Sequence, residues 1–261
     1  MDLEREYVLQ NYARYPLVLA RGKGCCVYDL EGRRYLDFIA GIGVNALGHA
    51  HPRIVAAIRE QAGLLIHTSN LYYNQYQGPL AKRLAEISGL QRTFFANSGT
   101  EAMEGALKMV HGHGRAIHPE KYEIISLENS FHGRTLGALS ITGQAKYREP
   151  FEPLIPGVKF VPINDVAALE AAFSERTAGI VLEMIQGEGG IYPLTHEFVA
   201  RARELADRYN ALLVADEIQC GVGRPGTYFA YQRSHPVILP DVMTAAKPLG
   251  CGIPLGVIVV N

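Results

Sequence analysis

The chain has 261 residues, of which 48% are hydrophobic and 20% are charged, and its formal net charge is −1. These values are typical of a globular protein with enough material for one large domain or two smaller ones. A net charge so close to zero gives no support for nucleic acid or an anionic membrane as a partner, and we expect neither.

The N-terminal segment MDLEREYVLQ lacks the apolar stretch of a secretory signal. The sequence also has no apolar run of about 18 residues that would span a membrane. Its four cysteines, Cys25, Cys26, Cys220 and Cys251, form no CxxC pair, so neither a zinc site nor a disulfide scaffold is indicated. We therefore expect a cytoplasmic protein with reduced thiols.

Short strands and turns are predicted in residues 17–40. The segment DLEGRRYLDF alternates apolar and polar residues around Glu31-Gly32, which is typical of a hairpin. Pro52 then stands where a helix begins, and apolar residues recur after it with helical spacing.

From residue 93 onward, apolar segments of strand length alternate with amphipathic segments. The predicted strands span residues 93–97, 122–129, 158–163, 179–185, 211–218, 241–246 and 255–261. The predicted helices span Thr100–Val110, Val166–Ser174 and His196–Tyr209. This alternation predicts an α/β fold with a mainly parallel seven-stranded sheet flanked by helices. Ligands bind at the carboxyl ends of the strands in such sheets, so we expect the functional residues to follow those ends.

The first such end is followed by Ser98-Gly99-Thr100, which would form the turn into a helix. Free backbone N–H groups and the positive end of the helix dipole suit a phosphate there. The alternative is a simple helix N-cap. After the second strand comes SFHGRT, where Phe131 could lie on a planar ring and Arg134 could bind a carboxylate. The alternative for SFHGRT is a surface loop with one buried phenylalanine.

Carboxylates follow two further strands. Glu183 and Glu188 frame a glycine-rich turn, either as an acid/base pair or as solvated or arginine-paired groups. Asp216 ends an apolar strand, and a buried aspartate needs a partner, which would be a metal, a cationic ring nitrogen or a lysine. Because Glu217 would point to the opposite face of the strand, a single cation fits better than a metal, and we expect no metal site. No histidine near Cys220 supports a nucleophilic thiol.

Lys247 is the one charged residue in TAAKPLGCGIPLG, directly after another predicted strand. An ammonium without a counter-ion in an apolar pocket has a lowered pKa, and its neutral amine reacts with carbonyl groups. A phosphate turn, a stacking aromatic and a carboxylate for a pyridinium nitrogen complete the requirements of pyridoxal 5′-phosphate (PLP). We therefore predict PLP as the cofactor.

The segments NSGTEA, SFHGRT, IQGEGG, ADEIQCGVGR and AAKPLGCGIPLG occur in this order along the chain. In sequence and spacing they resemble the class III (ω-amino-acid) aminotransferases of PLP fold type I, and within that family the acetylornithine aminotransferases. The resemblance extends to the N-terminal stretch that begins YPLVLARGKG.

The resemblance implies roles for particular residues. Lys247 would form the covalent link to the cofactor and later shuttle a proton. Asp216 would pair with the pyridine nitrogen, Gln219 would approach the ring hydroxyl, and Phe131 would stack on the ring. The residues that would hold the phosphate are Ser98, Gly99 and Thr100.

The resemblance also implies substrate contacts. Arg134 would bind the α-carboxylate, which leaves the distal amino group free to reach the cofactor. Glu188 would pair with an arginine of a C-terminal domain and switch between the two substrates. Ornithine aminotransferases tend to have a tyrosine where this chain has Ile42, which favours an N-acylated ornithine over free ornithine. Residues 67–73 resemble a segment at the active-site interface of a homodimer.

The implied reaction moves the distal amino group of N-acetylornithine, or of a similar ω-amino acid, to 2-oxoglutarate in arginine biosynthesis. The products would be N-acetylglutamate 5-semialdehyde and glutamate. The alternatives are an aminotransferase for ornithine, succinylornithine or 4-aminobutyrate, an aminomutase of the glutamate-1-semialdehyde type, or an inactive truncated remnant.

The resemblance places residues 1–47 in the N-terminal segment of a small domain and residues 48–261 in a large PLP-binding domain. Family members continue into a C-terminal small domain, which we expect to be absent from this chain. Met103 and Met184 stand where the family usually has asparagine and proline, and we interpret both as packing variation.

Overall fold

The computed structural model describes residues 1–261. Contacts between Cα atoms divide the chain into two compact units, Met1–Tyr72 and Tyr73–Asn261, and each unit is described by itself. The domain boundary predicted after residue 47 concerns the whole protein and stays a prediction.

The first unit contains a three-stranded antiparallel sheet in the order β1-β2-β3. Its elements are α1 (Asp2–Tyr7), β1 (Leu19–Lys23), β2 (Cys26–Asp29), β3 (Arg34–Leu36), α2 (Ala40–Gly43), α3 (Pro52–Ala62) and the 3₁₀ helix η1 (Ser69–Leu71). The predicted hairpin is confirmed between β2 and β3, where Gly32 has a φ of 82° that glycine adopts without strain. Asp29 stabilises the turn by accepting hydrogen bonds from Arg33 N and the Tyr35 hydroxyl, both at 2.8 Å.

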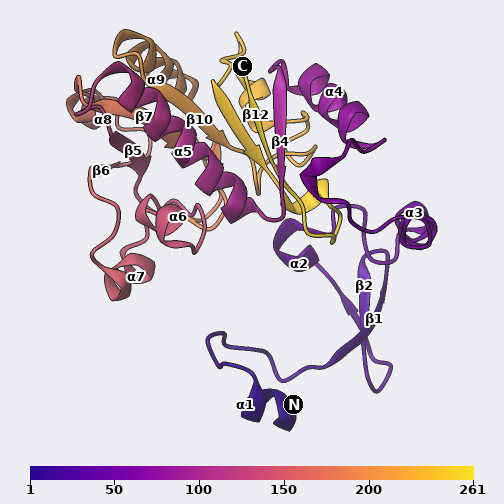
Figure 1. The fold of residues 1–261 in the computed structure, drawn as a ribbon. Helices are drawn as coiled ribbons and strands as arrows, with labels where there is room; N and C mark the ends of the chain where they lie inside the picture. Colours follow the sequence, from indigo (N-terminus) through magenta and orange to yellow (C-terminus); the bar gives the residue numbers. More distant parts are fainter. The chain divides into compact units, whose positions relative to one another are not determined.

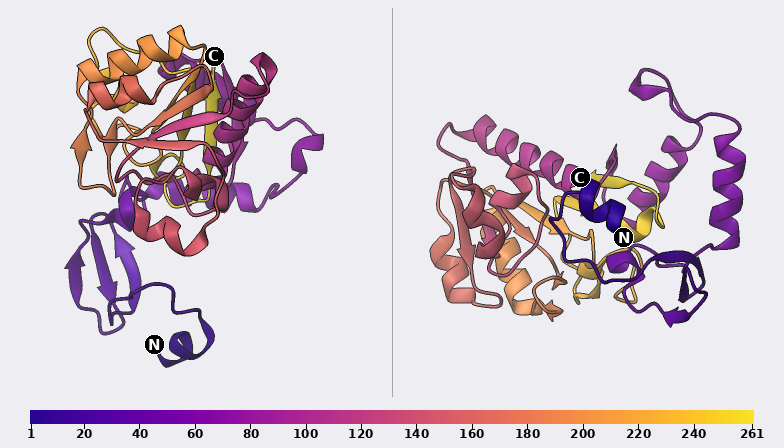
Figure 2. Two further views of the ribbon diagram at one scale, coloured as in Figure 1. Left: turned by 90° about the vertical axis from the view of Figure 1, so that its left-hand side faces the viewer. Right: turned by 90° about the horizontal axis from the view of Figure 1, so that it is seen from below.

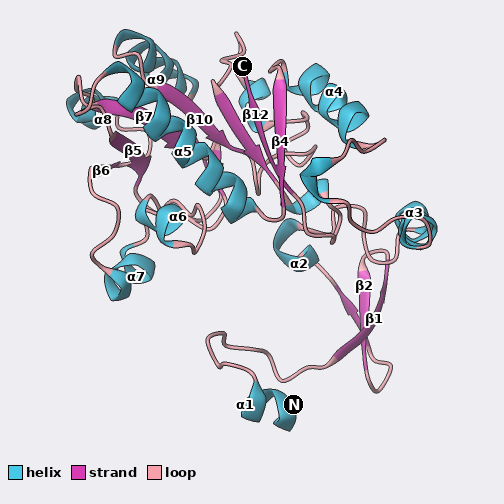
Figure 3. Ribbon diagram, viewed as in Figure 1, coloured by secondary structure: helices cyan, strands magenta, loops and turns pink.

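The second unit is an α/β domain (Figures 1 and 3). Its strands are β4 (Arg92–Ala96), β5 (Glu123–Leu127), β6 (Val158–Val161), β7 (Thr177–Leu182), β8 (Ile185–Gln186), β9 (Tyr192–Pro193), β10 (Leu212–Asp216), β11 (Val242–Ala245) and β12 (Gly256–Val260). Its α-helices are α4 (Gln77–Ser88), α5 (Gly99–Ile117), α6 (Leu136–Ser140), α7 (Ala145–Arg148), α8 (Val166–Ala172) and α9 (His196–Arg208). Its 3₁₀ helices are η2 (Glu149–Phe151), η3 (Ala230–Arg233) and η4 (Lys247–Leu249).

The main sheet has seven strands in the order β4-β12-β11-β10-β7-β5-β6, and all seven match predicted strands. Only β12 runs against the others, and it pairs with both β11 and β4. The connection between β11 and β12 contains only the short η4, whereas a parallel neighbour requires a longer crossover, usually with a helix. The fold class predicted from the sequence is therefore confirmed.

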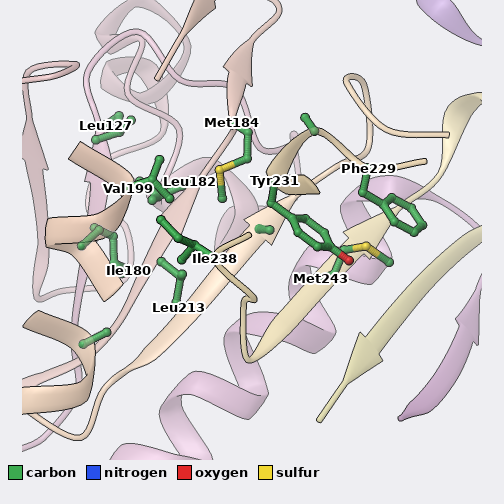
Figure 4. Packing of buried hydrophobic residues seen from close by; sticks show 14 of the residues in the cluster. Leu127, Ile180, Leu182, Met184, Val199, Leu213, Phe229, Tyr231, Ile238 and Met243 are labelled. Carbon is green, nitrogen blue, oxygen red and sulfur yellow. The ribbon is translucent and has the colours of Figure 1, made fainter. Parts of the chain in front are cut away.

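Helices cover both faces of this sheet (Figure 2). Buried residues of α5 pack on one face, and buried residues of α8 and α9 pack on the other. Figure 4 shows Val199 of α9 against the strand residues Ile180, Leu182 and Leu213. Full burial of each such side chain contributes about 1.5–3 kcal/mol, which fixes the strands that carry the site.

The two methionines that depart from the family pattern are core residues. Met103 lies in the cluster on the α5 face, and Met184 lies in the cluster on the opposite face. This agrees with the interpretation of both as packing variation.

Helix α5 is longer than predicted, and α4 was not predicted at all. The predicted helix ended at Val110, but α5 continues to Ile117. A Cβ at Gly114 would lie 2.2 Å from the Lys121 carbonyl oxygen. Gly114 therefore allows the helix backbone to pack against the backbone at Lys121, and the helix continues through it. None of the helices combines the length and apolar character that crossing a bilayer requires.

Candidate active site

The five sequence segments singled out above follow β4, β5, β7, β10 and β11. These strands run parallel to one another, because β12 is antiparallel to both β4 and β11 and the remaining neighbours pair in parallel. Their carboxyl ends therefore lie at the same edge of the sheet (Figure 1). The second unit thus brings the turn Ser98–Thr100, Phe131, Glu183, Asp216 and Lys247 to one edge, as the sequence predicted.

Ser98 is the N-cap of α5, since its hydroxyl accepts a hydrogen bond from Glu101 N at 3.2 Å. The capping alternative is therefore correct, and it is compatible with anion binding. The N–H groups of Gly99 and Thr100 belong to the first turn, where backbone donors have no intrahelical acceptor. A Cβ at Gly99 would lie 2.8 Å from Ile218 Cγ2. Only glycine lets this turn pack directly against the segment after β10.

Asp216 forms a buried pair with His132. The Asp216 side chain is 3% exposed and the His132 side chain is fully buried, and 2.7 Å separates His132 Nδ1 from Asp216 Oδ2. Asp216 Oδ1 also accepts a hydrogen bond from Ile218 N at 3.0 Å. Burial disfavours the imidazolium, but the hydrogen bond and charge of Asp216 outweigh it, so the pKa of His132 is raised.

Lys247 directly follows β11 and begins η4. Its φ of 35° is unusual for a residue with a side chain. Burial lowers the pKa of its amine, and nearby carboxylates, of which Glu188 acts most strongly, oppose this shift only in part. The direction agrees with the sequence argument for a nucleophilic lysine.

Phe131 and Arg134 lie in the loop between β5 and α6. Both approach Tyr147 of α7: the rings of Phe131 and Tyr147 meet edge to face at 6.0 Å, and the Arg134 guanidinium carbon lies 5.8 Å from the Tyr147 ring centre. Arg134 is exposed, whereas Phe131 is partly buried.

The two glutamates after β7 have different surroundings. Glu183 is 5% exposed and accepts hydrogen bonds from Phe131 N at 3.1 Å and from Gly187 N at 3.4 Å. Burial raises its pKa to about 7. Glu188 is exposed and accepts a hydrogen bond from Gln219 Nε2 at 3.2 Å. Glu183 is thus a buried group that links two loops, which differs from the solvated or arginine-paired alternative.

Glu217 points away from Asp216, as the strand geometry predicted. Its carboxylate accepts hydrogen bonds from Ala230 N at 2.8 Å and Tyr231 N at 3.0 Å, which anchors η3. Burial raises the pKa of Glu217 to about 7. The Cys220 thiol is buried and donates to Glu217, and burial raises its pKa well above the usual value. This is the opposite of what a nucleophilic thiol requires.

Ile42 belongs to the first unit, within α2, where its φ is 59°. Residues 67–73 span the boundary between the two units. The contacts of these residues with a substrate or with a second copy of the chain stay predictions.

Sequence reasoning missed three residues that shape this edge. His132 stands inside SFHGRT, but only Phe131 and Arg134 of that motif received roles. Tyr147 carries no local signal. Gly256 begins β12, where a Cβ would lie 2.1 Å from the Ser98 carbonyl oxygen. A glycine at a strand start was the one available sign of this close approach.

A model of the class-III aminotransferases matches residues 7–261, and the chain belongs to this family. It is 51% identical to the acetylornithine aminotransferase of Methanocaldococcus jannaschii over 262 residues, which cover all of this chain and 65% of that protein.

Two solved structures have the same fold. The N-acetylornithine aminotransferase of Stenotrophomonas maltophilia K279a is 39% identical with a TM-score of 0.85, and the match covers 100% of this chain and 64% of that one. The ornithine aminotransferase of Toxoplasma gondii, in a structure where PLP partially occupies the active site, is 36% identical with a TM-score of 0.92. That match covers 99% of this chain and 62% of that one. In all three comparisons the chain spans only part of the matched protein, about 65% of the length of the M. jannaschii enzyme.

Proposed function

We propose that this protein is a PLP-dependent aminotransferase that moves the distal amino group of N-acetylornithine to 2-oxoglutarate. The products are N-acetylglutamate 5-semialdehyde and glutamate, as in arginine biosynthesis. The observation that carries the proposal is the placement of Lys247, with its lowered pKa, at the same sheet edge as the buried Asp216–His132 pair. The names of the acetylornithine aminotransferases that it resembles support the choice of substrate.

The residues at this edge fit PLP. The first turn of α5 offers the N–H groups of Gly99 and Thr100 and the positive end of a 19-residue helix to a phosphate. Asp216 is a buried carboxylate held by His132 and by Ile218 N, and it would hold a protonated ring nitrogen. Lys247 offers an amine that burial shifts toward its neutral, nucleophilic form.

Each residue then has a definite task. Lys247 would hold the cofactor covalently and afterwards accept and return the substrate proton at Nζ. Ser98, Gly99 and Thr100 would hold the phosphate. When bound, PLP supplies an electron-withdrawing ring that accommodates negative charge at the reacting carbon.

The remaining groups would orient the cofactor and the substrates. Phe131 would lie on the ring face, and Gln219 would approach the ring hydroxyl. Arg134 would bind the α-carboxylate with two parallel hydrogen bonds, so that the amino group at the other end of the molecule meets Lys247. Glu188 would switch between substrates, and Ile42 would favour the acylated amino acid. The protein would act as a homodimer.

The test uses purified protein expressed from its complete gene. Adding PLP should produce a visible absorption band that is absent in Lys247→Ala but unchanged in Lys108→Ala, a control on the exposed side of α5. Loss of N-acetylornithine should require 2-oxoglutarate. A wild-type protein without the band, or with the same band in Lys247→Ala, would contradict the cofactor assignment.

The alternatives give different results in the same assay. Comparing kcat/KM for N-acetylornithine, N-succinylornithine, ornithine and 4-aminobutyrate identifies the amino donor. Turnover of glutamate 1-semialdehyde without any 2-oxo acid would indicate an aminomutase. Cofactor binding without turnover of any of these substrates would indicate an inactive remnant.

A further inference from the structure

A hydrogen-bonded network joins the first two turns of α5, including Thr100 of the proposed phosphate site, to the loop that carries Arg134. Thr135, the N-cap residue of α6, donates from its hydroxyl to the Glu104 carboxylate of α5. Glu104 Oε1 also accepts a hydrogen bond from Ala138 N at 3.0 Å. Thr100 Oγ1, in the first turn of α5, lies 3.1 Å from Thr135 Oγ1. Helices α5 and α6 pack together at this point (Figure 1).

The direction of these hydrogen bonds follows from the number of protons. A threonine hydroxyl has one proton to donate, and Thr135 gives its proton to the Glu104 carboxylate, which only accepts. Thr135 must therefore accept from Thr100 in the bond between the two hydroxyls. The chain of donors runs from Thr100 to Thr135 to Glu104, and it ends on a charge, which strengthens the last hydrogen bond.

Two glycines on either side of Arg134 show how closely this loop lies on α5. A Cβ at Gly133 would be 2.3 Å from Thr100 Oγ1, and the φ of Gly133 is 141°. A Cβ at Gly137 would be 2.3 Å from Glu104 Oε2. A larger residue at Gly133 would meet the Thr100 and Ala138 side chains in a strained backbone conformation, and one at Gly137 would displace the Glu104 carboxylate. The backbone of Arg134 is therefore held from both sides by α5.

We propose that Glu104 and Thr135 are positioning residues that fix Arg134 relative to the turn Ser98–Thr100 and thereby set the affinity for the α-carboxylate of the amino donor. The inference rests on the proposed function, in which Arg134 binds that carboxylate. The amino end of the substrate must reach Lys247 while its carboxylate is bound to Arg134, so the distance between the two sites selects the substrate. A displacement of about 1 Å in a group that positions the substrate can lower the reaction rate about 100-fold.

The experiment compares two amines that differ only in the carboxylate. N-acetylornithine has the α-carboxylate, and N-acetylputrescine is the same molecule without it. Thr135→Val, which keeps the side-chain shape and removes the hydroxyl, should raise KM for N-acetylornithine about tenfold and leave kcat/KM for N-acetylputrescine unchanged. Thr135→Ser should restore the wild-type KM. Calorimetry with N-acetylnorvaline, which has the carboxylate but no distal amine, should show the same tenfold weaker binding in Thr135→Val.

Controls separate this inference from the proposed function. Thr177→Val removes a threonine hydroxyl that is buried, unlike that of Thr135, and that accepts from Ser174 N at 3.0 Å at the amino end of β7. This variant should change neither KM. If Arg134→Gln does not raise KM for N-acetylornithine, the assignment of Arg134 in the proposed function is wrong. If Arg134→Gln raises KM but Thr135→Val does not, only the positioning inference is overturned.

Two further outcomes test the positioning role of Thr135 and Glu104. Equal losses for both amines in Thr135→Val would overturn the inference, because the network would then act on the reaction in general and not on the carboxylate. Should Thr135→Val fail to fold, Glu104→Gln keeps the size of the side chain and removes its charge. The same selective rise in KM is expected for Glu104→Gln, and its absence would overturn the inference.

Discussion

The buried pair of His132 and Asp216 makes the sharpest prediction about activity. Replacing His132 with leucine removes the donor that lies 2.7 Å from Asp216 Oδ2 and adds no new polar group. Replacing it with asparagine is milder, because the asparagine side-chain nitrogen can occupy roughly the place of Nδ1. The first variant removes the hydrogen bond, and the second keeps a hydrogen bond but removes the positive charge.

A hydrogen bond to a charged group contributes about 1.5–3 kcal/mol, and the His132–Asp216 hydrogen bond lies in a fully buried environment. If it holds the carboxylate in place for the cofactor, its loss should lower kcat/KM by about 10- to 150-fold. His132→Leu should show a drop in that range, and His132→Asn a smaller one. His113→Leu removes a histidine that bonds to the Asn210 carbonyl outside the site, so it is the matched control.

The assay is steady-state kinetics at saturating cofactor, with thermal melting to confirm folding. Wild-type kcat/KM in a folded His132→Leu protein would refute the assignment. Stability gives a second readout with a definite sign. Because the folded pKa of His132 is raised, its stabilising contribution is complete below about pH 6.5 and is lost as pH rises through the folded pKa. Glu183 and Asp216 face the imidazole, so the stability difference between the wild type and His132→Asn should shrink above about pH 6.5.

Two further predictions concern Gly99 and Glu217, which fix the backbone on either side of the site. Gly99→Ala places a Cβ 2.8 Å from Ile218 Cγ2 and should raise the Kd for PLP about tenfold, since the first turn of α5 must shift. Adding Ile218→Ala removes the clashing atoms and should restore the Kd in an absorbance titration, whereas an unchanged Kd in Gly99→Ala alone would contradict the close packing. Glu217 has its pKa raised from 4.5 to about 7, so the folded protein carries a stabilising contribution of about 3 kcal/mol that is complete below pH 4.5 and lost as pH rises through about 7. Glu217→Gln cannot titrate at this position. Urea unfolding at pH 5 and pH 8 should therefore show a larger fall in the free energy of unfolding for the wild type than for the variant. An equal fall in both proteins would show that Glu217 does not titrate near neutral pH.

Much of the architecture could be predicted because its signals are local. Apolar runs of strand length specified all seven strands of the main sheet, and helical spacing specified α5, α8 and α9. Helix ends were harder to predict: α5 continues beyond Val110, and Gly114 within it allows a close approach to the chain before β5 that no local pattern shows. Helix α4 was missed: its N-cap residue Tyr76 makes no side-chain cap, and Gly89, which ends the helix in the left-handed conformation, was not recognised as its stop signal.

For the candidate site, the placement of the motif residues was predictable, but their contacts were not. The carboxyl ends of parallel strands meet at one edge, so the order of motifs was enough to bring Ser98, Phe131, Asp216 and Lys247 together. The partners of these residues were not predictable. His132 and Asp216 are 84 residues apart in the chain, and they meet because β7 alone separates β5 from β10 in the sheet. Glu183, at the end of that middle strand, owes its raised pKa to the same burial.

The sequence by itself determined which residue types follow which strands, and with them the fold class, the family and the predicted cofactor. Only the tertiary structure decided which side chains touch: His132 with Asp216, Glu183 with the amides of two loops, and Thr135 with Glu104. The physical reason is that periodicity and turn chemistry act over a few residues. Hydrogen bonds between loops depend on the strand order in the sheet and on how closely glycines allow backbones to approach.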